Sequence, residues 1–583
     1  MRIKHTYPPL LTTFTIALAT LTLAACGGSS SNSKNNNSEP ITQAEKKFDC
    51  TGSNEAGARI ICIGSPDDLS DSAVQKHLLE ELAQAQTGDT YILPQGRYNF
   101  DRTVEYNGMT DNTPVSHLTF KGAGMDKTII DTSNASADGF LINNTDNLIF
   151  EDFGIYESNN NALKIKNSNG VIIRRMATVW ETDYQSTNGA YGMYPVETQN
   201  VLIEDSFVKG SADAGIYVGQ SDNIIVRNNI AEKNVAGIEI ENSTRADVYN
   251  NKAIKNTGGI LIFDLPIGNG KYGEGVRVFN NHVEDNNAPN FANKSSFAGG
   301  VHIVPPGTGV IVLSTSDVEI FNNVIKDHQT TSIAITSYLL ADESIVDLPN
   351  PEATSYGSIH PFADIYMDGW SPLVRNINVH SNDISVAEGV NDPEGDLIAD
   401  IIQGYQIFHI FNPDVANGKT TIPHILYDGA GELLANTPNP GGEGESILQA
   451  IVGGINQIAE GVKSNNPDAG DYTPIDLSKF AAYEQANALC QSSNGIDDLN
   501  LFAASVFETT PQPHSFDENG NPLSKLELLL EEGVNEVAAD IMADTKGVML
   551  CEEAYQGSPV TVIFDNEEFG CTSDDASNPL CSI

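Results

Sequence analysis

The sequence predicts an all-β fold, a right-handed parallel β-helix, with a helix that caps its N-terminal end and an irregular, partly helical C-terminal region. Three observations predict it: a strand pattern that recurs at a near-constant spacing, asparagines at fixed positions after that pattern, and a second strand between its copies. Recurrence at a period of about 20–50 residues is typical of solenoids, because each repeat buries its apolar face only against its neighbours.

The first strand pattern has two apolar residues that flank any third residue, often followed by paired polar residues. The second apolar residue of each copy is Phe120, Phe150, Ile173, Ile203, Val226, Val248, Val278, Ile320 or Val379. The closest copies are 22 or 23 residues apart. Longer steps contain insertions, which stacked repeats place in loops.

Asparagines recur at two offsets after this strand. The first set is Asn228, Asn250, Asn280 and Asn322, and the next set is Asn229, Asn251, Asn281, Asn323 and Asn382. Asparagine tolerates left-handed turns, and stacked asparagine side chains hydrogen-bond along a ladder. The shared register therefore predicts an asparagine ladder along the solenoid.

A second strand pattern lies between copies of the first. Its copies are residues 139–143, 162–168, 215–221, 237–243, 259–264, 300–306 and 332–337. Alternation places one set of apolar residues inward: Ile216/Val218, Ile238/Ile240, Ile260/Ile262, Val301/Ile303 and Ile333/Ile335. The residues between them are expected to face outward.

The two ends of the solenoid differ in pattern. Residues 73–85 have apolar residues at helical spacing, and a helix there would cover the open edge of the first coil. Residues 446–463 and 524–544 are typical of amphipathic helices. We expect a signal peptide at 1–25, a tether at 26–48, the β-helix at 49–385, and late turns with insertions and a disulfide-tied cap at 386–583.

The N-terminus predicts export. Arg2 and Lys4 precede an apolar run at 10–23, and Leu23-Ala-Ala-Cys26 follows. This ending resembles a bacterial lipobox, which implies that Cys26 is acylated. A polar Gly/Ser/Asn stretch at 27–37 is typical of a flexible spacer. Gly27, where retention in the inner membrane favours Asp, implies an outer-membrane lipoprotein, held at the membrane through its lipid alone.

Besides Cys26, the sequence has six cysteines, an even number that predicts disulfides in an exported chain. Cys50 and Cys62 are expected to pair, because they are close together and alone at the N-terminal end. Cys490, Cys551, Cys571 and Cys581 allow three pairings, which stay open here.

The composition is strongly acidic. A formal charge of −47 disfavours nucleic acids and anionic lipids as partners, and a polyanionic substrate needs a local basic patch. The oxygen-rich runs 391–396 and 517–521 are compatible with Ca²⁺, although such runs are usually solvated turns. Residues 268–273 match G-x-G-x-x-G but precede a strand pattern, so no dinucleotide site is expected.

The repeats carry a resemblance to a known family. NVLIEDS at 200–206, GIYVGQSDNIIVRNN at 215–229 and GVRVFNN at 275–281 look like the parallel β-helix repeat lipoproteins of the pectate-lyase-like superfamily. The resemblance covers roughly residues 75–385. It implies an exported protein and, since members are often encoded beside a lipoprotein or an exported c-type cytochrome, a c-type cytochrome as one possible partner. The family has no agreed catalytic residues, so none is carried over.

The outward face of the second strand is the candidate site. Its first column is predicted as Lys164, Gly192, Tyr217, Glu239, Leu261, His302 and Ala334, and its second as Lys166, Tyr194, Gly219, Glu241, Phe263, Val304 and Thr336. Coils stack about 4.8 Å apart, so His302 is expected about 10 Å from Glu239, across Leu261. Tyr217, Glu239 and His302 are candidate catalytic residues for removing and returning a sugar C5 proton, as lyases and epimerases do. Lys164, Lys166, Tyr194, Glu241 and Phe263 form the expected ligand-binding face.

Two functions remain open at this point. The first is an envelope protein that binds polysaccharide along the solenoid face, with its modification as a further hypothesis. The second is a non-catalytic surface scaffold that docks a protein such as a c-type cytochrome. The fold favours carbohydrate, whereas the lack of a catalytic motif favours a scaffold.

Overall fold

The computed structural model describes residues 45–48, 50, 59–110, 113–293, 300–386, 422–436, 439, 445–466, 472–482, 484, 487–495, 501–503 and 551–570. The predicted signal peptide, Cys26, Cys571, Cys581, the runs 391–396 and 517–521 and the helix expected at 524–544 lie outside these residues. The described residues belong to one compact unit, Gln43–Ile583.

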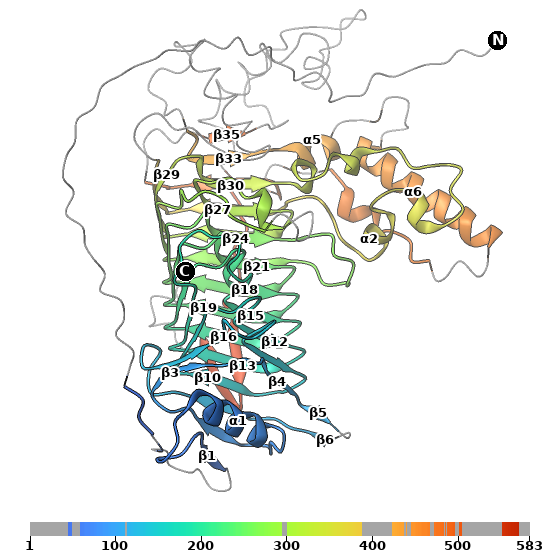
Figure 1. Cartoon of the computed structure of the whole chain (residues 1–583). Coiled ribbons are helices and arrows are strands. Elements are labelled where there is room, and N and C mark those ends of the chain that lie inside the picture. Colours follow the sequence, from blue (N-terminus) through green and yellow to red (C-terminus); the bar gives the residue numbers. More distant parts are fainter. Residues whose placement is uncertain are drawn as a thin grey trace, which may run out of the picture. The chain divides into compact units, whose positions relative to one another are not determined.

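Three parallel sheets run along this unit, and a typical coil contributes one strand to each (Figure 1). Sheet 1 consists of β1 (Ile60–Cys62), β2 (Thr90–Ile92), β7 (Thr119–Lys121), β10 (Leu148–Glu151), β13 (Asn169–Arg174), β16 (Gln199–Glu204), β19 (Asp222–Arg227), β22 (Thr244–Tyr249), β25 (Glu274–Phe279), β28 (Ser316–Phe321), β31 (Ile377–His380) and β34 (Leu489–Ser492). Sheet 2 consists of β3 (Gly96–Asn99), β8 (Thr128–Asp131), β11 (Gly154–Tyr156), β14 (Ala177–Val179), β17 (Phe207–Lys209), β20 (Ile230–Glu232), β23 (Lys252–Ile254), β26 (His282–Glu284), β29 (Val324–His328) and β32 (Asp383–Val386). Sheet 3 consists of β4 (Val104–Asn107), β9 (Phe140–Asn143), β12 (Leu163–Lys166), β15 (Met193–Val196), β18 (Ala214–Gly219), β21 (Ala236–Glu241), β24 (Gly258–Phe263), β27 (Thr308–Leu313), β30 (Thr331–Thr336), β33 (Ile425–Tyr427) and β35 (Leu501–Ala503). The predicted parallel β-helix is confirmed.

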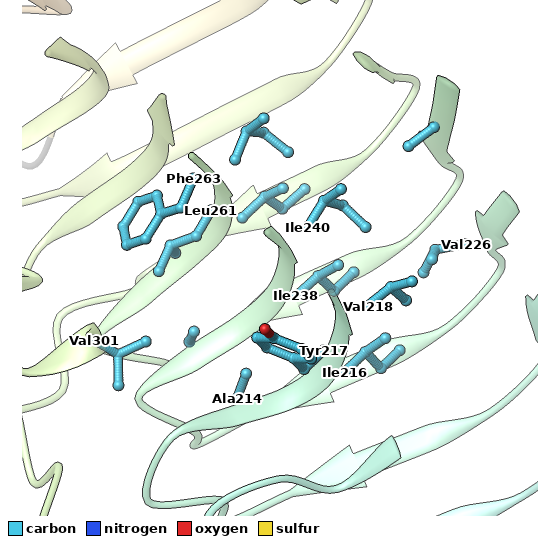
Figure 2. Packing of buried hydrophobic residues seen from close by; sticks show 14 of the residues in the cluster. Ala214, Ile216, Tyr217, Val218, Val226, Ile238, Ile240, Leu261, Phe263 and Val301 are labelled. Atoms are coloured by element: carbon cyan, nitrogen blue, oxygen red, sulfur yellow. The ribbon is translucent and has the colours of Figure 1, made fainter. Parts of the chain in front are cut away.

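The predicted register of sheet 1 is confirmed at every step. Each aligned residue pairs with the next, from Phe120 through Val226 to Val379. Sheet 3 agrees for Ile216, Ile238 and Ile260, which pair in turn and point into the core. Figure 2 shows Ile238 and Ile240 on the opposite side of the sheet from Leu261 and Phe263. Sheet 2, whose strands are mostly three or four residues long, was not predicted.

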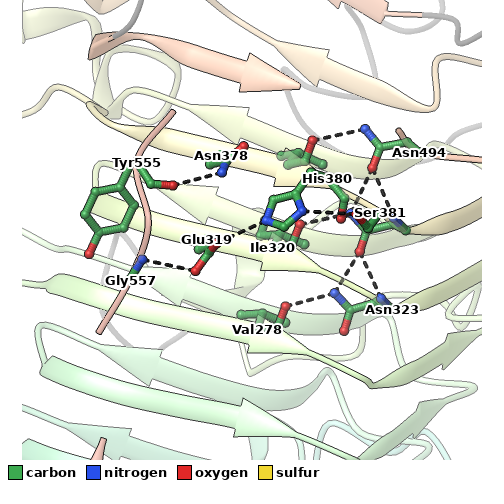
Figure 3. A network of polar contacts seen from close by, with 12 residues as sticks. Val278, Glu319, Ile320, Asn323, Asn378, His380, Ser381, Asn494, Tyr555 and Gly557 are labelled. Atoms are coloured by element: carbon green, nitrogen blue, oxygen red, sulfur yellow. Dashed lines mark hydrogen bonds and ion pairs between the residues drawn. The ribbon is translucent and has the colours of Figure 1, made fainter. Parts of the chain in front are cut away.

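The two asparagine columns have different roles. The backbone of Asn228, Asn250, Asn280 and Asn322 is left-handed, with φ between 54° and 58°, so this column makes the turns. The next column is buried, and each Asn Nδ2 donates to the Oδ1 of the next coil's Asn at 2.9–3.1 Å, from Asn229 to Asn494. Part of this ladder is drawn in Figure 3. A second ladder, Asn234–Asn256–Asn286, was not predicted and ends on His328.

A helix covers the N-terminal coil, and several helical segments lie between the strands of the C-terminal coils. Helix α1 (Asp71–Leu82) begins after Ser70, whose hydroxyl accepts from the Ala73 amide, and it buries Val74, Leu78 and Leu82, so the predicted cap is confirmed. The other helical segments are η1 (Val301–Ile303), η2 (Tyr338–Leu340), η3 (Glu343–Val346), η4 (Tyr356–Ser358), α2 (Ala363–Met367), α5 (Ala430–Asn436), α6 (Ile447–Asn465) and η5 (Leu477–Phe480). Helix α6 confirms the helix predicted at 446–463, and Ser446 with Gln449 forms its capping box.

A C-terminal strap, residues 551–570, crosses the outer face of sheet 1. It contains the hairpin β36 (Thr561–Phe564) and β37 (Glu567–Gly570), and a smaller hairpin, β5 (Met109–Thr110) with β6 (Thr113–Pro114), lies near the other end of the chain. Val560, Val562 and Phe564 of the strap pack on an apolar row of sheet 1 formed by Ile172, Leu202 and Ile225. The strap therefore covers a surface that would otherwise be exposed and apolar.

Two disulfides are present. Cys50 pairs with Cys62, as predicted. Of the pairings left open for the C-terminal cysteines, the structure has Cys490 with Cys551, which ties the strap to β34. Residues 268–273 lead into the strand β25, as the strand pattern after them predicted.

Candidate functional site

The outward face of sheet 3 differs from its predicted columns. Lys164 pairs with Tyr194, and the register Met193–Ile216 sets Tyr194 opposite Tyr217. Tyr217 then pairs with Glu239 and Glu239 with Leu261. Tyr194 therefore belongs to the first column, whereas it was predicted in the second. Gly192, which was predicted in the first column, precedes the strand β15.

The predicted position of His302 in the first column is wrong. Leu261 is followed in the column by Ile311 of β27, and His302 lies in η1, within the insertion that precedes this strand. The segment 300–306 imitates the repeat in its apolar spacing, but it ends in Pro305 and Pro306, which cannot donate to a sheet ladder. The competing segment 308–313 has no proline, and this difference is the signal that identifies the strand.

Most of this outward face is covered by other parts of the chain. The side chains of Glu239, Tyr217 and Phe263 are 1%, 3% and 1% exposed, and Glu241 is buried as well. Insertions between the strands fold over the face: Val304, from the segment after η1, reaches the outer side of β24 beside Leu261. Lys164, Lys166 and Tyr194 keep partial exposure.

Three tyrosines meet on this face. The ring centroids of Tyr191, Tyr194 and Tyr217 are 4.4, 4.7 and 4.8 Å apart, and the Lys164 Nζ lies 4.7 Å from the centre of the Tyr194 ring. Tyr191 and Tyr194 are half-buried, so part of this aromatic surface is open to solvent.

Three carboxyl groups lie beside these rings. Glu241 Oε1 accepts hydrogen bonds from the Tyr217 hydroxyl at 2.8 Å and from Gln220 Nε2 at 3.2 Å. Asp213 is hydrogen-bonded to Tyr191. Glu239 Oε2 is buried and has no hydrogen-bond partner among the described residues. We call Asp213, Glu239, Glu241, Gln220, Tyr191, Tyr194 and Tyr217 together the carboxyl–tyrosine site.

All three carboxyl groups hold their protons more tightly than usual. Burial raises the pKa of Asp213 to about 8 and that of Glu241 to about 7, and it raises the pKa of Glu239 well above its ordinary value. Negative charge on Glu241 and Asp213 raises the pKa of Glu239 further. Carboxyl groups that titrate near neutral pH are suited to general acid and base catalysis and are concentrated at functional sites.

The structure thus brings together some of the predicted site residues and separates others. Tyr217, Glu239, Glu241, Tyr194 and Lys164 lie in one place. Phe263 is buried in the apolar part of the same face, and Lys166 pairs with Glu197 at 3.2 Å.

Asp213 and Tyr191 were not predicted, because both lie just before a strand rather than within one. Among the described residues, no three His, Cys, Asp or Glu side chains are grouped closely enough to hold a metal ion.

These pKa values predict a loss of stability as the pH rises from about 4 to 8. Within this window the unfolded carboxyl groups lose their protons while the folded ones keep them, so the free energy of unfolding decreases with pH. For Glu241 alone, the rise from 4.5 to about 7 corresponds to roughly 3 kcal/mol. Glu239→Gln should flatten this dependence and raise the melting temperature at pH 8, which thermal melts at several pH values measure.

The matched control is Glu105→Gln, an exposed carboxyl in the same column at the N-terminal end of sheet 3. It should leave the pH dependence unchanged. A pH dependence equally steep in Glu239→Gln and in the unmodified protein would contradict the assignment.

Comparisons with known proteins agree with the architecture. Residues 128–325 and, overlapping them, 187–386 match the family model described as a right handed beta helix region. No curated protein matches this sequence. None of the described helices is long and apolar enough to cross a membrane.

Several solved structures are similar. The A-module of a mannuronan C-5 epimerase of Azotobacter vinelandii is 14% identical, with coverage of 55% of this chain and 85% of that one and a TM-score of 0.32. The catalytic unit of an α-1,3-glucanase of Streptomyces thermodiastaticus is 16% identical, with coverage of 58% and 62% and a TM-score of 0.34. A DFA-IIIase of Arthrobacter chlorophenolicus is 10% identical, with coverage of 61% and 87% and a TM-score of 0.33.

Proposed function

We propose that the protein binds polysaccharide at the carboxyl–tyrosine site and modifies it by proton transfer. The site lies in the right-handed β-helix region, residues 128–386. One observation carries the proposal: half-buried tyrosine rings lie against carboxyl groups that keep protons near neutral pH.

The two kinds of side chain serve different needs of a sugar ligand. Tyrosine presents a rigid apolar face and a polar hydroxyl, which suits the alternating apolar and polar surface of a sugar ring. Carboxyl groups accept hydrogen bonds from sugar hydroxyls and transfer protons. The hypothesis of a lyase or epimerase that used His302 loses its histidine, so the chemistry falls to Asp213, Glu239 and Glu241.

Binding is tested with the purified protein on an array of neutral and acidic glycans, next to Tyr194→Ala and the control Glu105→Gln. Tyr194 is half-buried and touches both other tyrosines, so its loss should weaken binding at least about 10-fold if stacking contributes about 1.4 kcal/mol or more. The control should bind like the unmodified protein. Equal binding by Tyr194→Ala, or binding to no glycan, would count against the proposal.

We further propose that Cys26 anchors the protein to the outer membrane through its lipid. The sequence Leu23-Ala-Ala-Cys26 and the polar stretch after it support this. Cys26→Ser should release folded protein into the soluble fraction, measured by fractionation of the cell envelope. Persistent sedimentation of this variant with the outer membrane would show that another feature holds the protein there.

A further inference from the structure

We propose that the carboxyl–tyrosine site hydrolyses a glycosidic bond between uncharged sugars, with Glu239 as general acid and Glu241 as general base. This inference rests on the proposed function, because it requires that a polysaccharide binds at the site. It adds the type of reaction, the role of each carboxyl group and the charge of the substrate.

The spacing of the two glutamates supports hydrolysis. Glu239 and Glu241 lie two residues apart on β21, so both project from the same face of sheet 3. The Cα atoms of residues two apart on a strand are separated by roughly 7 Å, so the two carboxyl groups can lie on either side of one glycosidic bond. A glycosidase needs one carboxyl group as acid and a second carboxyl group on the two sides of that bond.

The surroundings of the two carboxyl groups assign their roles. Glu241 Oε1 accepts two hydrogen bonds, from Tyr217 and Gln220, and these favour its charged form. Glu239 lies between Tyr217 and Leu261 in the column, its Oε2 has no partner among the described residues, and burial favours its protonated form. Glu239 therefore carries a proton to give, and Glu241 is placed to accept one.

The reaction is balanced with water as the only co-reactant. The Glu239 carboxyl gives its proton to the glycosidic oxygen as the bond from that oxygen to the anomeric carbon breaks. Glu241 removes a proton from a water molecule, and the water oxygen forms the new bond to the anomeric carbon from the opposite side. The products are two sugar hydroxyls, and proton exchange with solvent then restores both carboxyl groups.

The charge at the site favours an uncharged substrate. The charges that act on the pKa values of Asp213 and Glu239 all come from other carboxyl groups of the site. Lys164 lies over the Tyr194 ring, and the Lys271 ammonium donates to the backbone oxygen of Gln220. A uronate carboxylate placed against Glu239 and Glu241 would add a further negative charge and be repelled.

The burial of Glu239 determines how a sugar can reach it. Glu239 is only 1% exposed, so a sugar has to move the side chains that cover it, whereas Tyr191, Tyr194 and Asp213 are half-buried and reachable. Binding on the tyrosines thus precedes contact with Glu239.

The experiment uses the purified protein with a panel of neutral polysaccharides and uronic-acid polymers that includes every glycan bound on the array. Reducing ends report hydrolysis, ultraviolet absorbance of unsaturated uronates reports β-elimination, and proton NMR of the first product reports the anomer. We expect release of reducing ends from a neutral glycan, with an inverted anomer. Glu239→Gln and Glu241→Gln should each lose at least about 100-fold of the activity, whereas Glu105→Gln should keep it.

The outcomes separate the two proposals. Binding of a glycan without its hydrolysis, β-elimination of a uronate, or a retained anomer would overturn the inference and leave binding at the site intact. Binding to no glycan would overturn both proposals. The anomer is measured on the unmodified protein, so the inference stays testable even where a glutamate variant fails to fold.

Discussion

Ile240→Asp is expected to prevent folding, or to lower the free energy of unfolding by several kcal/mol. Ile240 is 1% exposed and points into the core of the solenoid, where it pairs in register with Val218 and Ile262. The change removes about 1.5–3 kcal/mol of apolar burial and adds the larger cost of an unpaired buried carboxylate. Chemical denaturation followed by circular dichroism measures the loss.

The matched control is the same substitution at Ile230, which lies on β20 and is 41% exposed. Ile230→Asp should change the free energy of unfolding by less than about 0.5–1 kcal/mol, since exposed positions tolerate charge. Equal losses for the two variants would mean that the inward face of β21 has been assigned to the wrong side.

The regular part of the fold was predictable because it follows local rules. A period-two apolar pattern together with a recurrence of 22 or 23 residues predicted sheet 1 residue by residue, up to Val379. The asparagine columns were predictable for the same reason, since Asn228 and Asn229 have roles that repeat in each coil. Sheet 2 was missed because strands of three or four residues have too few alternations to stand out.

The candidate site was only partly predictable, because it depends on segments that break the repeat. The column of Tyr217 and Glu239 was found from alternation, but the cover over its next member, Leu261, comes from an insertion, the segment of Val304. Burial changes the chemistry, because it is the main cause of the raised pKa of Glu239. The position of His302 was predicted wrongly because the insertion that contains it has the same apolar spacing as the strand pattern.

The path of the strap was beyond prediction as well. Its contacts join residues hundreds of positions apart, such as Val560 with Asp247 and Gly557 with Glu319 (Figure 3 shows the second). No local pattern in residues 551–570 states which coils they cross. The paired cysteines indicated a tie at this end, and the structure alone identifies Cys490 as the partner of Cys551.

Asp247→Ala is expected to destabilise the protein by about 3–5 kcal/mol, because it leaves a buried guanidinium unpaired. Arg277 donates to Asp247 from Nε at 2.8 Å and from Nη2 at 2.5 Å, and both side chains are 1% exposed beneath the strap. The variant also removes the acceptor of the Val560 amide, so the strap loses one of its anchors. Thermal melts should show the loss, and limited proteolysis should cut near residue 560 sooner.

The double variant Asp247→Leu with Arg277→Met distinguishes the charge from the packing. Both replacements are apolar and of similar length, and replacing a whole buried ion pair in this way is often neutral or stabilising. The double variant should therefore recover most of the stability that Asp247→Ala loses, while the Val560 amide still lacks its acceptor. If the melting temperature recovers, the loss of global stability in Asp247→Ala is due to the unpaired buried charge. If cutting near residue 560 persists in the same double variant, the hydrogen bond from the Val560 amide holds the strap in place. A double variant as unstable as the single one would instead show that the ion pair itself holds the coils of Asp247 and Arg277 together.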